Sequence, residues 1–214
     1  MNRFDRPRQT LAIGLAALAG YVDAIGFLSA DGYFVSFMSG NTTRMAVDMA
    51  QDWRTAAMPA MLIAGFVCGV AAGSAVGIRA GRWRKPAVTA LVALLLGSAA
   101  LLRGIDHQQG TLALIVVAMG AINNTFQRNG EVAVGLTYMT GALVKLGQAL
   151  GSLLARAPRP GWAAYGLLWL GLAGGALAGA HAYLALRDVA LWLAAGWALL
   201  ATLVAIVLAR REPA

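Results

Sequence analysis

One carboxylate stands inside a long apolar stretch of this sequence. Asp23 follows about 13 residues of mainly apolar sequence, which places it roughly 20 Å along a helix that rises 1.5 Å per residue. A charge at that depth in a membrane is costly and usually faces a cavity or a partner. Asp23 is therefore predicted either to bind a substrate, an ion or a proton, or to join helices through a hydrogen bond or an ion pair. Arg44 and Lys145 are the candidate partners for such a pair.

Two segments combine small, hydroxyl or amide side chains with a cation. Ser39, Gly40, Asn41 and Thr42 precede Arg44, and Thr140 and Gly141 precede Lys145. Ser, Asn and Thr favour N-caps and Gly permits unusual backbone angles, so each segment indicates a break followed by a helix start. Helices that begin inside a membrane direct free N–H groups and a partial positive charge at their surroundings. The two starts are predicted to form an anion-attracting centre. The alternative pairs Arg44 with Asp48 and extends Lys145 to the membrane surface.

Two adjacent amides, Asn123 and Asn124, lie at the corresponding depth of a later apolar stretch. Unpaired amides are costly in a membrane, so both side chains must form hydrogen bonds. One interpretation places them in the same polar cavity as Asp23. The other makes them hydrogen-bonding links between helices.

The elements that must position these residues are membrane helices. Of the 214 residues, 59% are apolar and only 12% are charged, against about 25% charge in ordinary soluble domains. A soluble domain cannot cover so much apolar surface with so little charge. The single cysteine, Cys68, excludes a disulfide scaffold. The net charge of +8 is assigned to cytoplasmic loops, not to nucleic-acid binding.

Six stretches are long and apolar enough to cross a bilayer, which takes about 20 residues per helix. They are residues 10–29, 56–79, 86–103, 110–128, 161–186 and 189–209. Two further stretches, 33–51 and 132–154, are less apolar and each contains one cation. They are either two more spans or segments that enter the membrane and return.

Loop charges decide between these alternatives. With six spans, two re-entrant segments and a cytoplasmic N-terminus, the Lys and Arg residues outside the two ambiguous stretches divide 12 inside to 3 outside. Eight full spans give 9 to 6, so the positive-inside rule favours six. The inside set is Arg3, Arg6, Arg8, Arg79, Arg82, Arg84, Lys85, Arg128, Arg156, Arg159, Arg210 and Arg211; the outside set is Arg54, Arg103 and Arg187.

The sequence repeats itself after about 100 residues. Residues 36–44 (SFMSGNTTR) align with residues 137–145 (TYMTGALVK) at an offset of 101, and residues 20–23 align with residues 120–123 at an offset of 100. Residues 1–104 and 105–214 are therefore predicted to be two halves of one membrane domain. Three spans per half, an odd number, would place the halves in opposite orientations, as in many transporters.

Glycines recur at four-residue spacing in both halves. They are Gly65, Gly69, Gly73, Gly77 and Gly81, echoed by Gly171, Gly175 and Gly179. Small residues at this spacing let helices approach closely. The partner is either the other half of the chain or a second subunit.

At these residues the sequence resembles the YoaK-type family of bacterial multispan membrane proteins, which carry a domain of unknown function. The matching pieces are Gly20-Tyr21-Val22-Asp23-Ala24, Ser36-Phe37-Met38-Ser39-Gly40-Asn41-Thr42, Met119-Gly120-Ala121-Ile122-Asn123 and Leu136-Thr137-Tyr138-Met139-Thr140-Gly141. The family often has His in place of Phe37 and Gln in place of Ile122. The resemblance implies an inner-membrane protein, often described as a permease, and supplies no substrate.

These observations predict an all-α polytopic membrane protein with six spans, two re-entrant or broken segments and two inverted three-span repeats. The first functional hypothesis is a transporter or channel for a small polar or anionic solute, in the bacterial inner membrane with both termini cytoplasmic. The alternatives are a scaffold that packs, also as a homo-oligomer, through its glycines, and, less favoured, a membrane-embedded enzyme. The sequence lacks metal-ligand clusters, a Cys–His pair and phosphate-binding loops, so no metal, cofactor or catalytic residue is expected. The cations are assigned to loops, so no nucleic-acid partner is expected either.

Overall fold

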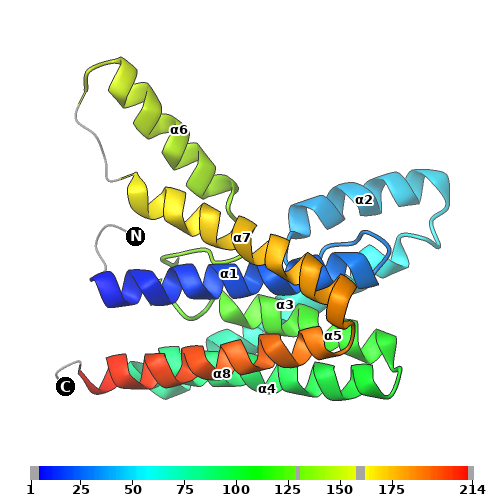
Figure 1. Ribbon diagram of the computed structural model, residues 1–214. Coiled ribbons are helices and arrows are strands. Elements are labelled where there is room, and N and C mark those ends of the chain that lie inside the picture. Colours follow the sequence, from blue (N-terminus) through cyan, green and yellow to red (C-terminus); the bar gives the residue numbers. More distant parts are fainter. Residues whose placement is uncertain (1–4, 129–130, 158–161, 212–214) are drawn as a thin grey trace.

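The computed structural model describes residues 5–128, 131–157 and 162–211 (Figure 1). Within these ranges the chain is helical except for its connections and one two-stranded hairpin, β1 (Gln127–Arg128) and β2 (Glu131–Val132). A short 3-10 helix, η1 (Gly81–Trp83), joins two of the α-helices. The α-helices are α1 (Arg6–Ser29), α2 (Met38–Gln51), α3 (Ala57–Ala80), α4 (Arg84–Gly104), α5 (Gln108–Ile122), α6 (Thr140–Leu154), α7 (Ala163–Leu186) and α8 (Val189–Arg210).

Four stretches of the described chain are long and apolar enough to cross a membrane. They are α1, α7, α8 and the 48-residue stretch Ala57–Gly104. This last stretch contains two α-helices, α3 and α4, and the chain turns between them at Gly81. The φ of Gly81 is 54°, a value that suits a residue without a side chain. The chain is thus an all-α membrane protein.

Helix α5 is shorter than the sequence predicts. It ends at Ile122 after 15 residues, whereas the apolar pattern extends to residue 128. Asn124 N–H bonds to Ala121 O and Thr125 N–H bonds to Ile122 O, so the backbone tightens into turns there. A helix of 15 residues spans about 22 Å, less than the hydrocarbon core of about 30 Å.

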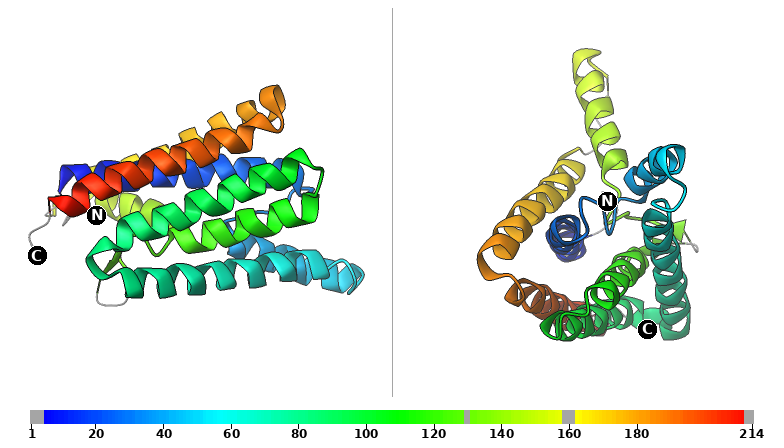
Figure 2. Two further views of the ribbon diagram at one scale, coloured as in Figure 1. Left: turned by 90° about the horizontal axis from the view of Figure 1, so that it is seen from below. Right: turned by 90° about the vertical axis from the view of Figure 1, so that its right-hand side faces the viewer.

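Helices α1 and α5 lie at the centre of the bundle, and α1, α5 and α8 supply most of the buried residues of the hydrophobic core. Helices α7 and α8 pack against α1, while α3 and α4 pack against α5. Helix α4 also packs along α8, which closes the bundle (Figure 2). The apolar stretches of the sequence predict these helices, but only the packing in the structure shows which helices lie at the centre.

The glycines at four-residue spacing pack inside the chain. Gly69 and Gly73 of α3 lie against the backbone of α5, and Gly175 and Gly179 of α7 lie against the backbone of α1. A Cβ atom added at Gly73 would lie 2.7 Å from the carbonyl oxygen of Ala121, so these helices approach as closely as glycine allows. The partner is therefore another helix of the same chain. Gly81 is not part of this contact, since it forms the turn.

The two ends of the bundle carry different charges. Helix α1 begins and helix α8 ends at the same end of the bundle (Figures 1 and 2). The turn between α3 and α4 lies at this end too, because its Arg82 lines one cavity with Arg8 of α1. At the opposite end, Arg103 forms an ion pair with Asp188 at 2.9 Å. Arg8 and Arg82 thus lie at the end opposite Arg103, as the charge count requires, and which end is cytoplasmic stays a prediction. Arg3 and Arg159 lie outside the described residues.

Helices α2 and α6 diverge from the bundle (Figure 1). Helix α2 packs against α3 and helix α6 packs against α7, and most of their residues are exposed. At 14 and 15 residues they are too short to cross a bilayer. Their N-terminal ends lie nearer to each other than their C-terminal ends (Figure 1).

Candidate functional site

Asp23 fixes the connection between α1 and α2. Its Oδ1 atom accepts hydrogen bonds from the backbone N–H groups of Val35 at 3.0 Å and Ser36 at 2.8 Å. Because Asp23 lies six residues before the end of α1, the connection returns about 9 Å along that helix before α2 begins. The bonds give partners to backbone groups that irregular structure leaves free. The side chain stays half-buried.

Asn123 does the same for the connection between α5 and α6. Its Oδ1 atom accepts a hydrogen bond from the N–H of Leu136 at 3.1 Å, and its Nδ2 atom donates to Thr137 Oγ1 at 3.0 Å. Asn123 is buried. The predicted likeness between Asp23 and Asn123 therefore extends to the bond that each one makes.

Asn124 has a different role from its neighbour. Its Nδ2 atom donates to the carbonyl of Val70 in α3 at 3.0 Å, and its Oδ1 atom accepts from Gln127 Nε2 at 2.5 Å. Asn124 therefore links helices, which is the second of the two predicted interpretations.

The break before α2 lies upstream of its predicted position. Residues 39–42 belong to the first turns of α2, and the irregular segment is 30–37. Asn41 is buried and bonds both backbone groups of Phe34, at 2.9 Å to the N–H and 2.6 Å to the carbonyl. Thr42 bonds within the helix, to Met38 O, and Ser39 is exposed. A side chain at Gly40 would displace the exposed ring of Phe37, since an added Cβ would lie 2.5 Å from it.

Arg44 pairs with neither of the carboxylates considered for it. Its Nη1 atom donates to the carbonyl of Gly32 at 2.7 Å, and its guanidinium carbon lies 4.4 Å from the centre of the Tyr33 ring. The Tyr33 hydroxyl donates to Asp48 at 2.7 Å. Tyr33 thus stands between Arg44 and Asp48, while the Asp23 carboxylate is occupied by backbone N–H groups. An Arg44–Asp23 ion pair is absent from this part of the structure.

Lys145 belongs to a cavity of about 150 Å³ at the start of α6. Its Nζ atom lies 3.4 Å from the hydroxyl of Tyr165 and 4.6 Å from the centre of that ring. Gly141 and Tyr138 also line the cavity, whereas Thr140 is exposed at the first residue of the helix. The full lining is Val132, Ala133, Val134, Gly135, Tyr138, Gly141, Ala142, Lys145, Tyr165 and Leu168.

The predicted site residues divide between the two connections. Asp23, Asn41 and Arg44 bond to the first connection, and Asn123 bonds to the second, beside the cavity that holds Lys145. Helices α2 and α6 do not contact each other among the described residues. The aromatic partners of the two cations, Tyr33 and Tyr165, carried no signal in the sequence, because the contacts form only when the chain folds back.

No three His, Cys, Asp or Glu side chains gather into a metal site in the described part of the chain.

Residues 11–204 match the protein family of unknown function DUF1275. The chain is also 39% identical over 211 residues to a UPF0700 transmembrane protein of Rhizobium meliloti (strain 1021), covering 96% of this chain and 91% of that protein. No solved structure matches the chain. The chain belongs to the DUF1275 family, the YoaK-type family that its motifs resemble, and is a multi-pass membrane protein.

Proposed function

We propose that this member of the DUF1275 family is a transporter or channel for a small polar or anionic solute, which binds where α2 and α6 begin. The observation that carries the proposal is the pair of irregular connections held by Asp23 and Asn123. Irregular backbone at membrane depth is tolerated only when it is buried in protein or lines a water-filled cavity. Broken helices near the membrane centre are the usual substrate sites of secondary transporters.

The packing supports two structurally equivalent halves. Helix α1 packs on α7 and α8 of the second half, and its counterpart α5 packs on α3 and α4 of the first. Helix α2 packs on α3 as α6 packs on α7. If α1–α4 are exchanged with α5–α8 in order, each contact between two α-helices corresponds to a contact that is also present. With three bundle helices in each half, we propose an inverted repeat, in which α2 and α6 are the re-entrant elements.

The cavity beside α6 supports an anionic or polar solute. Lys145 and the hydroxyl of Tyr165 face one small space, and the first turn of α6 begins at its edge. Free N–H groups at a helix start attract anions, and Lys145 adds a full positive charge. The volume of about 150 Å³ is below the ~300 Å³ of pockets for drug-sized ligands, which favours a small solute.

The bundle contacts argue against the scaffold hypothesis. A scaffold that packs through its glycines needs those glycines on a free surface, yet Gly73 and Gly175 lie against helices of the same chain.

We also propose no enzymatic activity, because Asp23, Asn41 and Asn123 bond to the backbone of the connections. At the cavity, Lys145 has only the hydroxyl of Tyr165 as a side-chain partner among the described residues. The orientation that we propose is the one with the cation-rich end in the cytoplasm of a bacterial inner membrane.

Uptake into liposomes tests the proposal. We expect the purified protein to carry at least one member of a panel of small anions and zwitterions, and we expect Asp23→Asn to change the dependence of uptake on an ion or proton gradient. The matched control is Asn124→Gln, which retains an amide at a link between helices. Uptake by no member of the panel above that of empty liposomes, with the protein folded, would reject transport.

A further inference from the structure

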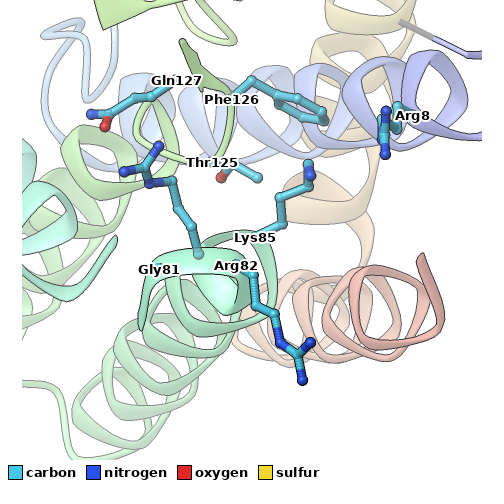
Figure 3. Close-up of a pocket in the computed structure, with 8 residues that line it drawn as sticks. Arg8, Gly81, Arg82, Lys85, Thr125, Phe126 and Gln127 are labelled. Atoms are coloured by element: carbon cyan, nitrogen blue, oxygen red, sulfur yellow. The ribbon is translucent and has the colours of Figure 1, made fainter. Parts of the chain in front are cut away.

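The cation-rich end of the bundle contains a second cavity, of about 230 Å³. Four of its lining residues are cations: Arg8, Arg82, Arg84 and Lys85. The others are Gly81, Thr125, Phe126 and Gln127 (Figure 3). This cavity shares no residue with the one at Lys145, so its ligand is a separate question from the transported solute.

Three separate parts of the chain build this cavity. Arg8 comes from the first turns of α1, while Arg84 and Lys85 are the first two residues of α4. The third wall is the segment directly after α5, where Phe126 is buried and Thr125 is 1% exposed. Gly81, with φ of 54°, reverses the chain between α3 and α4 and thereby brings the two cations of α4 to α1 (Figure 3).

The electrostatics of the cavity favour an anion with several oxygens. Asp5 lies 3.5 Å from Arg8 and offsets part of the charge of Arg8. Arg84 donates from Nε to Gly77 O at 3.4 Å, so the two terminal nitrogens of Arg84 are the ones to donate to an anion. The N-terminus of α4, a helix of 21 residues, adds its partial positive charge at the same place. Arg8, Arg84 and Lys85 are half-buried, so the attraction is screened less than at an open surface.

We propose that this cavity binds a phosphate group. Arginine recognises phosphate through paired N–H bonds, and lysine adds a point charge. The ligand is either the headgroup of an anionic phospholipid, since basic pockets at the ends of membrane helices bind such lipids, or a soluble phosphate compound. The volume of about 230 Å³ accommodates a phosphate group together with part of the molecule that carries it.

The test compares the two sources of phosphate on the same protein. In one arm, native mass spectrometry measures how much phosphatidylglycerol the detergent-solubilised protein retains against phosphatidylcholine. In the other arm, thermal unfolding is followed in phosphatidylcholine nanodiscs while pyrophosphate is added. We expect one arm or both to show binding, and we expect Arg8→Gln with Lys85→Gln to weaken it at least fivefold.

The controls separate this cavity from the general charge of that end. Arg79→Gln removes one charge from an exposed position at the same end that is outside the cavity, and it is expected to change binding less than twofold. Lys85→Arg, which keeps the charge, is expected to retain binding even if the double variant folds poorly. Binding in neither arm, or an equal loss in Arg79→Gln and Lys85→Gln, would overturn the proposal.

Discussion

Asp23 and Asn123 stand 100 residues apart and make the same contact. Each uses its Oδ1 atom to accept a backbone N–H from the connection that follows its helix, Ser36 for Asp23 and Leu136 for Asn123. One uses a carboxylate and the other an amide. The contact itself therefore needs an oxygen acceptor and does not need a charge.

The first prediction separates the anchor from the charge. Asp23→Asn keeps an oxygen at the same place, so we expect the free energy of unfolding to fall by less than about 1 kcal/mol. Asp23→Ala leaves the N–H groups of Val35 and Ser36 without this acceptor and is expected to cost ~1–3 kcal/mol. Thermal unfolding in detergent measures both. Equal losses in the two variants would mean that the charge itself holds the connection.

The second prediction concerns two adjacent glycines of α7. Gly175 is buried against the carbonyl of Ala17, so Gly175→Ala forces α1 and α7 apart and is expected to cost ~1–3 kcal/mol. Gly174 is exposed and has no neighbouring atom within 4 Å of an added Cβ, so Gly174→Ala is the matched control and is expected to cost nothing. The comparison requires only two melting curves. Equal melting temperatures would contradict the close packing of α1 and α7.

These glycines also show how far the sequence predicts the fold. Their spacing predicts close packing of helices, because the absence of a side chain at each glycine can be read directly from the sequence. The lengths of the apolar stretches predict the long helices in the same way. The partner of α7 is not local, and nothing near Gly175 in the sequence identifies α1. The start of α2 is similar: Phe37 provides no side-chain cap, and Asp23, 15 residues before Met38, fixes the connection instead.

The candidate site was predictable in its polar residues but not in their contacts. Asp23 and Asn123 are unusual within apolar stretches, so the sequence identifies them. Arg44 was expected to meet a carboxylate, since opposite charges attract, but the chain places the ring of Tyr33 and the carbonyl of Gly32 against it. That outcome depends on how the 30–37 segment folds back, which residue types alone do not specify.

The third prediction fixes the orientation of the bundle. Ile105 and Arg82 are exposed and lie in turns at opposite ends, so a cysteine at only one of them should react with an impermeant maleimide added to intact cells. We expect Ile105→Cys to react and Arg82→Cys to react only after permeabilisation, in a background where the exposed Cys68 is replaced by Ala. The reverse pattern would invert the orientation, and labelling of both would contradict their placement at opposite ends.

The last prediction tests whether the cavity at the start of α6 is water-filled and attracts anions. Gly141 lines this cavity and has room for a side chain, because no atom lies within 4 Å of an added Cβ. Lys145 lies one turn later on the same face of α6. In a Cys68-free protein, Gly141→Cys should react with soluble methanethiosulfonate reagents, and the anionic reagent should react faster than the cationic one.

The size of that effect follows from Coulomb's law. Two unit charges about 4–8 Å apart in water interact by about 0.5–1 kcal/mol, so adding Lys145→Gln should slow the anionic reagent by about two- to sixfold. Gly147→Cys is the matched control, because Gly147 is exposed on α6, also has room for a side chain, and lies outside the cavity. There Lys145→Gln should have less effect on the rate. Because Lys145 is exposed, the effect at Gly141 should shrink as salt is raised. A cysteine at 141 that reacts with neither reagent would mean that lipid fills the cavity, and the anion-binding part of the proposed function would be wrong.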